Sequence, residues 1–346
     1  MTSLRAGVIG LGVGFQHALG LAQHPDCELV ALCDRDPAKL HEASERFPGA
    51  EPFDSAEALL EGCDLDLVCV ASYDEDHAAQ ILRALALGRH VFAEKPLSVH
   101  PEETAAIHEA LERHPHLRLS SNTVLRASPR FADLKRRIDA GRLGRIYAIE
   151  GDYNYGRLEK LTDGWRGRIP DYSVILGGGI HMADLLLWLT GQPVREVMAM
   201  GNGIASAGSR FTGRDYAVAL LQFADGTVGK LTANFGCVEP HVHRLLVYGT
   251  EATFENRRGP ARLWQSRAAD AKPEAIETPY PGVTKHALLP SFIAAIRHGS
   301  RPLVDENDVL GAMQLCHAIE QALDCGRPVR VQAPHLSRTL REAHHA

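Results

Sequence analysis

Short apolar runs alternate with amphipathic stretches over the first 120 residues. The apolar runs predict strands at residues 5–9, 28–33, 65–71, 90–93 and 117–120. Apolar residues at helical spacing predict helices at residues 15–23, 37–47, 74–87 and 101–113. Strands that are apolar throughout are usually covered on both faces, and their alternation with helices indicates a parallel sheet. We therefore expect a doubly wound α/β domain with its ligand at the carboxyl ends of the strands.

The rest of the chain has a different pattern. Helical spacing occurs at residues 128–140, 180–189, 285–298 and 306–325. Segments in which apolar and polar residues alternate predict an antiparallel sheet, and they cover residues 146–155, 194–201, 216–223, 228–235 and 245–248. This pattern is typical of an α+β domain with a large, mainly antiparallel open sheet. The change of pattern places the boundary after Ser121, which gives domains of residues 1–121 and 122–346.

Composition limits the possible functions. The 346 residues suffice for about two domains, and 45% of them are hydrophobic, so a buried core can form. With 37 basic and 43 acidic side chains the formal charge is −6, which argues against an extended nucleic-acid surface. The sequence has no apolar run of the roughly 18–20 residues that a membrane span needs. Its seven cysteines form no CxxC pair, so we expect reduced thiols in a cytoplasmic protein.

A glycine-rich turn follows the first predicted strand and opens the first predicted helix. It reads Gly10-Leu-Gly-Val-Gly-Phe15, so Gly10 would permit a tight turn. Gly12 and its neighbour Val13 would let the backbone approach a pyrophosphate at the helix N-terminus. A strict dinucleotide motif has its third glycine at position 15, where this chain has Phe15, with Gly14 one place early. An ordinary strand–helix turn is the alternative.

An acidic residue supports the dinucleotide interpretation. Asp34 ends the second predicted strand, where its side chain can accept hydrogen bonds from the adenosine ribose. A helix cap before Pro37 is the alternative, but it does not explain the spacing from the glycine turn. The first domain is therefore predicted to be a Rossmann domain that binds NAD or NADP. Asp34 would repel a 2′-phosphate and favours NAD, whereas Arg35 beside it could pair that phosphate.

The third predicted strand ends in Ala71-Ser-Tyr-Asp-Glu-Asp-His77. Ala71, Ser72 and Tyr73 follow at the ligand edge of the sheet, so we predict that they contact the cofactor. The three acidic residues after them favour the first turn of a helix, whose dipole stabilises negative charge. His77 is either a further cofactor contact or a polar packing residue.

The segment Gly88-Arg-His-Val-Phe-Ala-Glu-Lys-Pro-Leu97 contains Glu94-Lys95-Pro96 at the end of the fourth predicted strand. It strongly resembles the glucose–fructose oxidoreductase/inositol dehydrogenase family, also written Gfo/Idh/MocA. The resemblance covers most of the chain, and the order and spacing of its parts are specific. Besides the glycine turn with His17, these parts are Asp34-Arg35, Asn122, Arg126-Ala-Ser-Pro129, Gly141-Arg-Leu-Gly144, Trp165-Arg166, Gly177-Gly-Gly-Ile-His-Met-Ala-Asp184 and Trp188-Leu-Thr-Gly191.

The resemblance implies a nicotinamide-dependent oxidoreductase that acts on a sugar, a sugar nucleotide or a cyclitol. It implies that Lys95 is the catalytic lysine, that Glu94 lies near the nicotinamide and that His181 shares in proton transfer. The residue types suit this chemistry, because oxidation of a secondary alcohol to a ketone releases a proton that a side chain must take. A histidine titrates near neutrality and can relay that proton. A surface lysine before a turn is the alternative for Lys95.

Two positions depart from the family pattern. Tyr73 stands where members commonly have a proline, and Gly177 stands where many have an aspartate, four residues before the catalytic histidine. Either the lysine and the histidine suffice, or another group supplies the third role. Asp184 shares a helix face with the histidine and could orient its imidazole. The candidates for the third role are Asp184, Tyr155 and Asp171.

Further residues are expected to contact the ligands. Tyr155 and Asn154 lie on the predicted strand 146–155, and aromatic and amide groups suit sugar faces and hydroxyls. Core packing is the alternative for the tyrosine. Near the domain boundary, Asn122 and Arg126 could reach either ligand. In the second domain, Trp165 and Arg166 could cover the nicotinamide. The predicted substrate contacts are Lys95, Arg126, Asn154, Tyr155, His181 and Asp184.

A possible metal site and the assembly state complete the predictions. Cys237, Glu239, His241 and His243 share parity along a possible strand, as zinc ligands would. Pro240 interrupts that strand, and relatives use no metal, so we expect none here. The resemblance also implies a homodimer or homotetramer that forms through the outer face of the second sheet.

Two other functions stay open beside hydride transfer between nicotinamide and a secondary alcohol or ketone. Some relatives hydrolyse glycosides through a transient oxidation in which NAD is recycled. The fold also allows a non-catalytic NAD-binding regulator, because fold alone does not determine function. The presence of both Lys95 and His181 argues against the regulator.

Overall fold

The computed structural model describes residues 3–169 and 172–332, and the chain divides into two compact units. Of these residues, the first unit holds 3–127 and 283–310, and the second holds the rest. The domain boundary after Ser121 stays a prediction. The return of residues 283–310 to the first unit is not indicated by the sequence pattern.

Within the described residues, six parallel strands form the sheet of the first unit, in the order β3-β2-β1-β4-β5-β6. The strand order reverses between β1 and β4, and sheets of this kind bind ligands beyond the carboxyl ends of the strands at that point. The strands are β1 (Leu4–Ile9), β2 (Cys27–Cys33), β3 (Glu51–Phe53), β4 (Leu67–Val70), β5 (His90–Ala93) and β6 (Leu119–Ser121).

Helices connect these strands as the alternating pattern predicts. The connecting helices are α1 (Gly14–Ala22), α2 (Pro37–Arg46), α3 (Ala56–Gly62), α4 (His77–Ala86) and α5 (Pro101–Arg113), and the returning segment, residues 283–310, adds α9 (Leu289–His298) to this unit. Asp36 caps α2 by accepting the Ala38 N–H. The cap before Pro37 is therefore Asp36, and the alternative that gave this role to Asp34 is wrong. The sequence pattern missed β3 and α3.

Hydrogen bonds to β6 explain why the returning segment, residues 283–310, belongs to the first unit. β6 is the last strand of its sheet, and its backbone and side chains bind this segment. The Ser120 hydroxyl donates to the Val304 carbonyl at 2.8 Å, and the Leu119 N–H donates to the Glu306 carboxylate at 3.2 Å. These bonds satisfy polar groups that would otherwise be buried without partners at the edge of the sheet.

The second unit is built on a nine-stranded sheet within the described residues, in the order β14-β13-β12-β11-β7-β10-β9-β8-β15. β7 and β10 are parallel, and the other neighbours are antiparallel, so the predicted fold class is confirmed. The strands are β7 (Ile146–Asn154), β8 (Val194–Asn202), β9 (Tyr216–Phe223), β10 (Val228–Asn234), β11 (Val242–Gly249), β12 (Thr253–Asn256), β13 (Ala261–Trp264), β14 (Glu274–Ile276) and β15 (Val329–Arg330).

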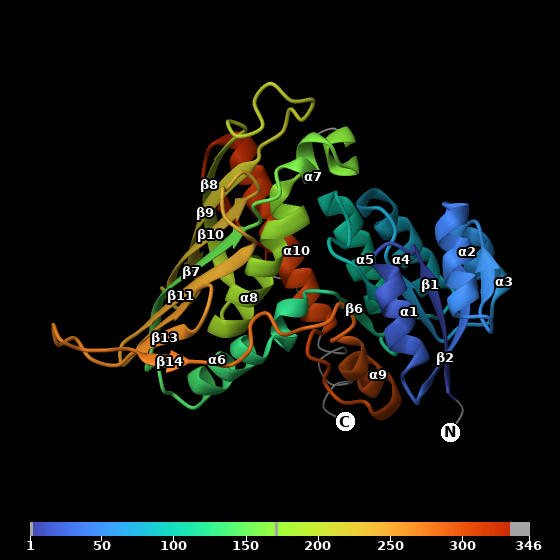
Figure 1. Cartoon of the computed structure of the whole chain (residues 1–346), viewed down its shortest axis with the longest axis horizontal. Coiled ribbons are helices and arrows are strands. Elements are labelled where there is room, and N and C mark those ends of the chain that lie inside the picture. The colour runs from blue at the N-terminus through green and yellow to red at the C-terminus, as the bar shows by residue number, and fades with distance from the viewer. Residues whose placement is uncertain (1–2, 170–171, 333–346) are drawn as a thin grey trace. The chain divides into compact units, whose positions relative to one another are not determined.

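Helices cover one face of this sheet, and α8 packs against β7 and β10 (Figure 1). The helices of the unit are α6 (Pro129–Asp139), α7 (Glu159–Thr162) and α8 (Ile180–Thr190), together with the later part of α10 (Glu306–Cys325). Along β9, Ala219 and Leu221 are buried while Leu220 between them is exposed, as a sheet covered on one face requires. No helix among the described residues is long and apolar enough to cross a membrane.

The glycine turn yields a stability prediction. Gly10 has φ of +86°, and a Cβ there would lie 2.4 Å from the Ala71 carbonyl oxygen. Gly12 lacks a positive φ, and a Cβ there would meet nothing within 4 Å. We expect Gly10→Ala to lower the free energy of unfolding by roughly 1–3 kcal/mol. Gly12→Ala, the matched control, should change it by less than about 0.5 kcal/mol. Thermal and urea unfolding measure both, and equal losses would contradict the assignment of strain to Gly10.

Candidate functional site

The glycine turn is fixed by backbone bonds and one carboxylate. The Gly10 N–H donates to the Cys33 carbonyl at 2.8 Å, which ties the turn to the end of β2. Asp34 accepts from the Leu11 N–H at 2.6 Å through one oxygen and from the Asp36 N–H at 2.8 Å through the other. Asp34 thus joins the ends of β1 and β2 at the sheet edge where the sequence predicts a ribose contact.

The turn has room for a phosphate ligand. Gly12 is exposed, and nothing lies within 4 Å of where its Cβ would be. The first residues of α1 have no side-chain cap, so this helix N-terminus can bind an anion through its N–H groups. A Cβ at Gly14 would lie 3.0 Å from the Val8 side chain, so Gly14 provides the close helix–strand packing. Phe15 instead packs on Phe47, with ring centroids 5.6 Å apart. The residues present fit a dinucleotide.

Other residues predicted to contact the cofactor have defined surroundings. Arg35 is exposed and forms an ion pair with Asp76, with 2.8 Å between nitrogen and oxygen. Ser72 donates to the Gln80 side chain at 2.7 Å, and Tyr73 is 43% exposed. The adjacent Ala71 carbonyl lies against Gly10. These positions agree with the predicted edge of the sheet, but contact with a cofactor stays a prediction for each of them.

Glu94, at the end of β5, is held by groups from two other elements. One of its oxygens lies 2.9 Å from His17 Nε2 on α1 and accepts from the Asn122 amide at 2.7 Å. Burial alone would raise the pKa of Glu94, but the hydrogen bond and charge of His17, the charge of Lys95 and the Asn122 hydrogen bond outweigh it and lower this pKa to about 2. Glu94 is therefore an ionised carboxylate beside the half-buried Lys95.

His77 links two loops at this edge. Its imidazole is buried, with Nδ1 2.7 Å from the Pro96 carbonyl oxygen and Nε2 3.2 Å from the Ser72 carbonyl oxygen. Because carbonyl oxygens only accept, a neutral imidazole donates to one of them, and the shorter contact is the stronger candidate. His77 therefore fixes the turn that carries Lys95, which favours the packing role over a direct cofactor contact.

Several buried polar atoms near Glu94 have no hydrogen-bond partner among the described residues. They are His17 Nδ1, Ser121 Oγ, Asn122 Oδ1 and Thr123 Oγ1. Buried polar groups normally have partners, so such a group of atoms at the end of β6 is consistent with a polar ligand. Arg126, by contrast, is already paired, since it lies 2.8 Å from the Asp308 carboxylate and donates to the Leu303 carbonyl.

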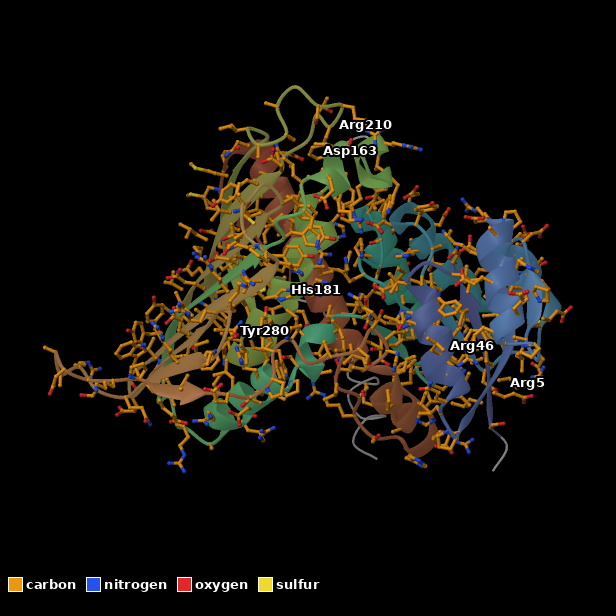
Figure 2. All side chains as sticks on the ribbon, viewed as in Figure 1. Arg5, Arg46, Asp163, His181, Arg210 and Tyr280 are labelled. Atoms are coloured by element: carbon orange, nitrogen blue, oxygen red, sulfur yellow. The ribbon has the colours of Figure 1, made fainter. Side chains whose placement is uncertain are left out.

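In the second unit, His181 lies in an aromatic group built on β7, β11 and α8. The Tyr153 ring stacks on His181 with centroids 5.9 Å apart, and Tyr155 stacks on Tyr153 at 5.5 Å. The centroid of the His243 ring lies 6.2 Å from that of His181 and 6.1 Å from that of Tyr280. Figure 2 labels His181 and Tyr280. His243 Nδ1 and the Tyr280 hydroxyl are 2.7 Å apart. The structure therefore brings the predicted Tyr155 and His181 together within this unit.

Other predicted residues of the second unit have different surroundings. Asn154 follows Tyr153 on β7, so alternation turns it to the opposite face, where its amide donates to Glu239 at 2.7 Å. The structure thus does not bring Asn154 to the face that carries His181. Asp184 is fully buried. Burial, followed by the charges of Glu320 and of Asp184, raises the pKa of the Cys316 thiol on α10. Asp171 lies outside the described residues.

Trp165 and Arg166 form a packed pair in a short 3-10 helix, Trp165–Arg168. The Arg166 guanidinium carbon lies 4.5 Å from the centre of the Trp165 ring, and the Arg166 Nε donates to the Tyr172 hydroxyl at 2.9 Å. The sequence analysis missed Tyr172, and it assigned no role to Tyr153. The glycines at positions 177 and 178 are the signal that could have found them, because glycine often marks a close approach by another group.

The possible strand through Cys237, Glu239 and His241 is not present. β11 begins at Val242, after Pro240, so the premise that these side chains share one face of a strand is wrong. Among the described residues no group of three or more His, Cys, Asp or Glu side chains could hold a metal ion.

Glu94 gives a prediction on acid stability. Its pKa is lowered from 4.5 to about 2 on folding, so ionised Glu94 stabilises the fold above pH 4.5, and this stabilisation is lost as pH falls from about 4.5 to about 2. Glu94→Gln should therefore destabilise the protein near neutrality, by on the order of 3 kcal/mol. The difference from wild type should shrink across that acid range. Thermal melting followed by circular dichroism measures it, and a pH-independent difference would contradict the assignment.

The chain is similar in sequence and in fold to known inositol dehydrogenases. The chain is 25% identical over 341 residues to myo-inositol 2-dehydrogenase of Thermotoga maritima, covering 95% of this chain and 99% of that protein. It is 27% identical over 344 residues to scyllo-inositol 2-dehydrogenase (NAD(+)) of Bacillus subtilis, covering 95% and 96%. The crystal structure of myo-inositol 2-dehydrogenase from Lactobacillus plantarum has the same fold, with a TM-score of 0.83 at 20% identity over 96% of this chain and all of that one.

Family models match both parts of the chain. Residues 4–122 match the oxidoreductase family model for an NAD-binding Rossmann fold, and residues 131–255 match the GFO/IDH/MocA C-terminal domain. These matches confirm the family and the cofactor class that the sequence resemblance predicted. The chain belongs to the Gfo/Idh/MocA family and is an NAD-dependent oxidoreductase.

Proposed function

We propose that the protein is a cyclitol dehydrogenase, with an inositol or a closely related ring polyol as its substrate and with Lys95 and His181 in proton transfer. The observation that carries this proposal is the position of Lys95. It follows a carboxylate that His17 and Asn122 hold at the ligand edge of the sheet, and His77 anchors the next residue. The full-length similarity to two inositol dehydrogenases supports a cyclitol over a sugar nucleotide.

The residues of the first unit would hold the cofactor in a defined way. The backbone at Gly12 and the N-terminus of α1 would bind the pyrophosphate, and Asp34 would bind the adenosine ribose. Asp34 and Asp76 place two carboxylates in this region, and Asp76 already pairs Arg35, which supports NAD over NADP. When bound, the nicotinamide supplies the hydride acceptor or donor.

Side chains of the protein itself would carry out the proton transfer. Lys95 would hold the reacting oxygen and take its proton during oxidation, and the resulting ammonium would return it during reduction. His181, stacked on Tyr153, would relay the proton.

We propose a homodimer or homotetramer as the working form. We also propose the cytoplasm as its compartment, which the seven cysteines without disulfides support.

Single and double variants test the shared proton transfer. Lys95→Met should lower kcat for inositols by roughly 10²–10⁴-fold, because it removes the group that exchanges the proton, while NAD binding stays within about threefold. His181→Gln should also lower kcat. The double variant should lose less than the product of the two single losses, because residues that act as a unit are not additive.

NADH absorbance at 340 nm and calorimetric NAD binding provide the measurements. Joint loss of NAD binding and turnover in Lys95→Met would show that this lysine is structural. Absence of NADH formation by the wild type across inositol isomers, sugars and sugar nucleotides would contradict the dehydrogenase. Release of sugar from a glycoside without net NADH would identify the hydrolase alternative.

The outer face of the second sheet supports self-association. Met198 and Met200 on β8 and Leu220 on β9 are exposed there, and Met198 pairs with Leu220 across the two strands. The next strand presents Lys230, whose Nζ lies 2.9 Å from Glu150 and 3.1 Å from Asp152. Apolar side chains beside a compact group of charges are typical of interfaces that have an apolar core and a polar rim.

A charge substitution on this face tests the assembly. Met200→Arg should convert the wild-type oligomer to a smaller species, because burying an unpaired guanidinium is costly. Light scattering after size exclusion measures the mass. Glu28→Arg, an exposed change on β2 of the first unit, serves as the matched control and should leave the mass unchanged. A monomeric wild type, or an unchanged mass for Met200→Arg, would contradict this interface.

A further inference from the structure

His243, on β11, belongs both to the aromatic group of His181 and to a buried polar network. The centroid of its ring lies 4.6 Å from that of His241, 5.4 Å from that of Tyr153 and 6.2 Å from that of His181. His243 is 7% exposed, whereas His181 and His241 are half-buried, so this group can be reached from solvent on one side. Ligand sites combine such aromatic walls with a few precisely placed polar groups.

The polar network begins at a buried arginine. Arg130 Nη1 donates to the side-chain oxygen of Asn256 at 3.0 Å. A guanidinium can only donate, so this bond fixes which end of the Asn256 amide is the oxygen. The Asn256 nitrogen in turn donates to the His243 carbonyl at 2.6 Å. Arg130, Asn256 and His243 are all buried, so water does not compete for these bonds.

Tyr280 connects this network to the His243 imidazole. Its phenol oxygen accepts the His243 backbone N–H at 2.7 Å and lies 2.7 Å from His243 Nδ1. Burial raises the pKa of Tyr280 to about 12, while hydrogen bonds from the His243 N–H and from Asn256 oppose this rise. The phenol is therefore protonated, and its oxygen already accepts other bonds, so its O–H donates to Nδ1. A neutral imidazole carries one proton, which this bond places on Nε2.

We propose that His243 is a specificity-determining residue, whose Nε2–H donates to a hydroxyl of a ring polyol held beside His181, and that Tyr280 is its positioning residue. This inference rests on the proposed function and deepens it, because it concerns which ring polyols the site accepts. Ring packing alone would be served by a phenylalanine and needs no fixed tautomer. A polyol whose hydroxyl has the other configuration would leave the N–H without its acceptor, and sites built in this way reject such analogues strongly.

Two amide substitutions separate the roles of the ring nitrogens. His243→Gln places an N–H near the position of Nε2, whereas His243→Asn reaches only the position of Nδ1. We expect His243→Asn to lower kcat/KM for the preferred inositol by roughly 10–100-fold and to weaken the discrimination among inositol isomers, because the bond to the hydroxyl is lost. His243→Gln should retain most of both. In a series of monodeoxy-inositols, the one that lacks the contacted hydroxyl should be oxidised equally by wild type and by His243→Asn.

The tautomer is measured without any ligand. Long-range correlation of ring protons with 15N in histidine-labelled protein should show His243 with its proton on Nε2. Tyr280→Phe removes the donated proton and should lower both the Nε2–H share and kcat/KM, and it also serves if His243→Asn does not fold. Tyr248→Phe, the same chemical change next to Tyr147 on the same sheet, is the matched control and should alter neither quantity.

The outcomes separate this inference from the proposed function. A proton on Nδ1 in the wild type, or an unchanged isomer preference in His243→Asn, would overturn the inference while the dehydrogenase stands. If the wild type oxidises none of the polyols, the proposed function fails. Calorimetric binding of the same polyols to the NADH-loaded protein then tests His243: weaker binding in His243→Asn but not in His243→Gln supports it, and equal binding or none refutes it.

Discussion

The ligand edge of the first unit depends on a buried carboxylate. Burial disfavours an ionised Glu94, and the negative charge persists because His17, Asn122 and Lys95 surround it. These residues belong to α1, to the end of β6 and to the turn after β5, so satisfying one charge brings three separate parts of the chain to the same place. Asn122 also donates to the Lys285 carbonyl, which extends the connection to the returning segment. Leaving such a charge unpaired would cost several kcal/mol.

The elements with a strong pattern were predictable from the sequence. The strand and helix alternation of the first 120 residues, and the alternation along β7, β8, β9 and β10, depend on which side chains face the core. β3 and β12–β14 were missed because three or four residues carry too little pattern to be distinguished from loops. Asp34 was located by its spacing from the glycine turn, but its bond to Leu11 depends on a turn geometry that no local pattern encodes.

In the candidate site, too, some residues were predictable from the sequence and others were not. Lys95, Glu94 and His181 were identified through a resemblance, and the structure adds what surrounds each of them. Asn154 and Tyr155 are neighbours in sequence, but the pleat sends them to opposite faces, and only Tyr155 joins the aromatic group of His181. Tyr172 was missed because its hydroxyl occupies the space that a side chain at Gly177 would fill. The contact depends on two positions and cannot be inferred from either alone.

The bonds between β6 and the returning segment have a consequence for how the chain folds during synthesis. The Leu119 N–H and the Ser120 hydroxyl find their acceptors at Glu306 and Val304, which leave the ribosome almost 190 residues later. The central strand β7 of the other unit likewise waits for β10 and β11. Neither unit can be completed in the order in which it is made, so both expose unpaired strand edges until most of the chain is available. Long-range pairings of this kind slow folding, and the strand edges stay exposed, and open to aggregation, until their late partners arrive.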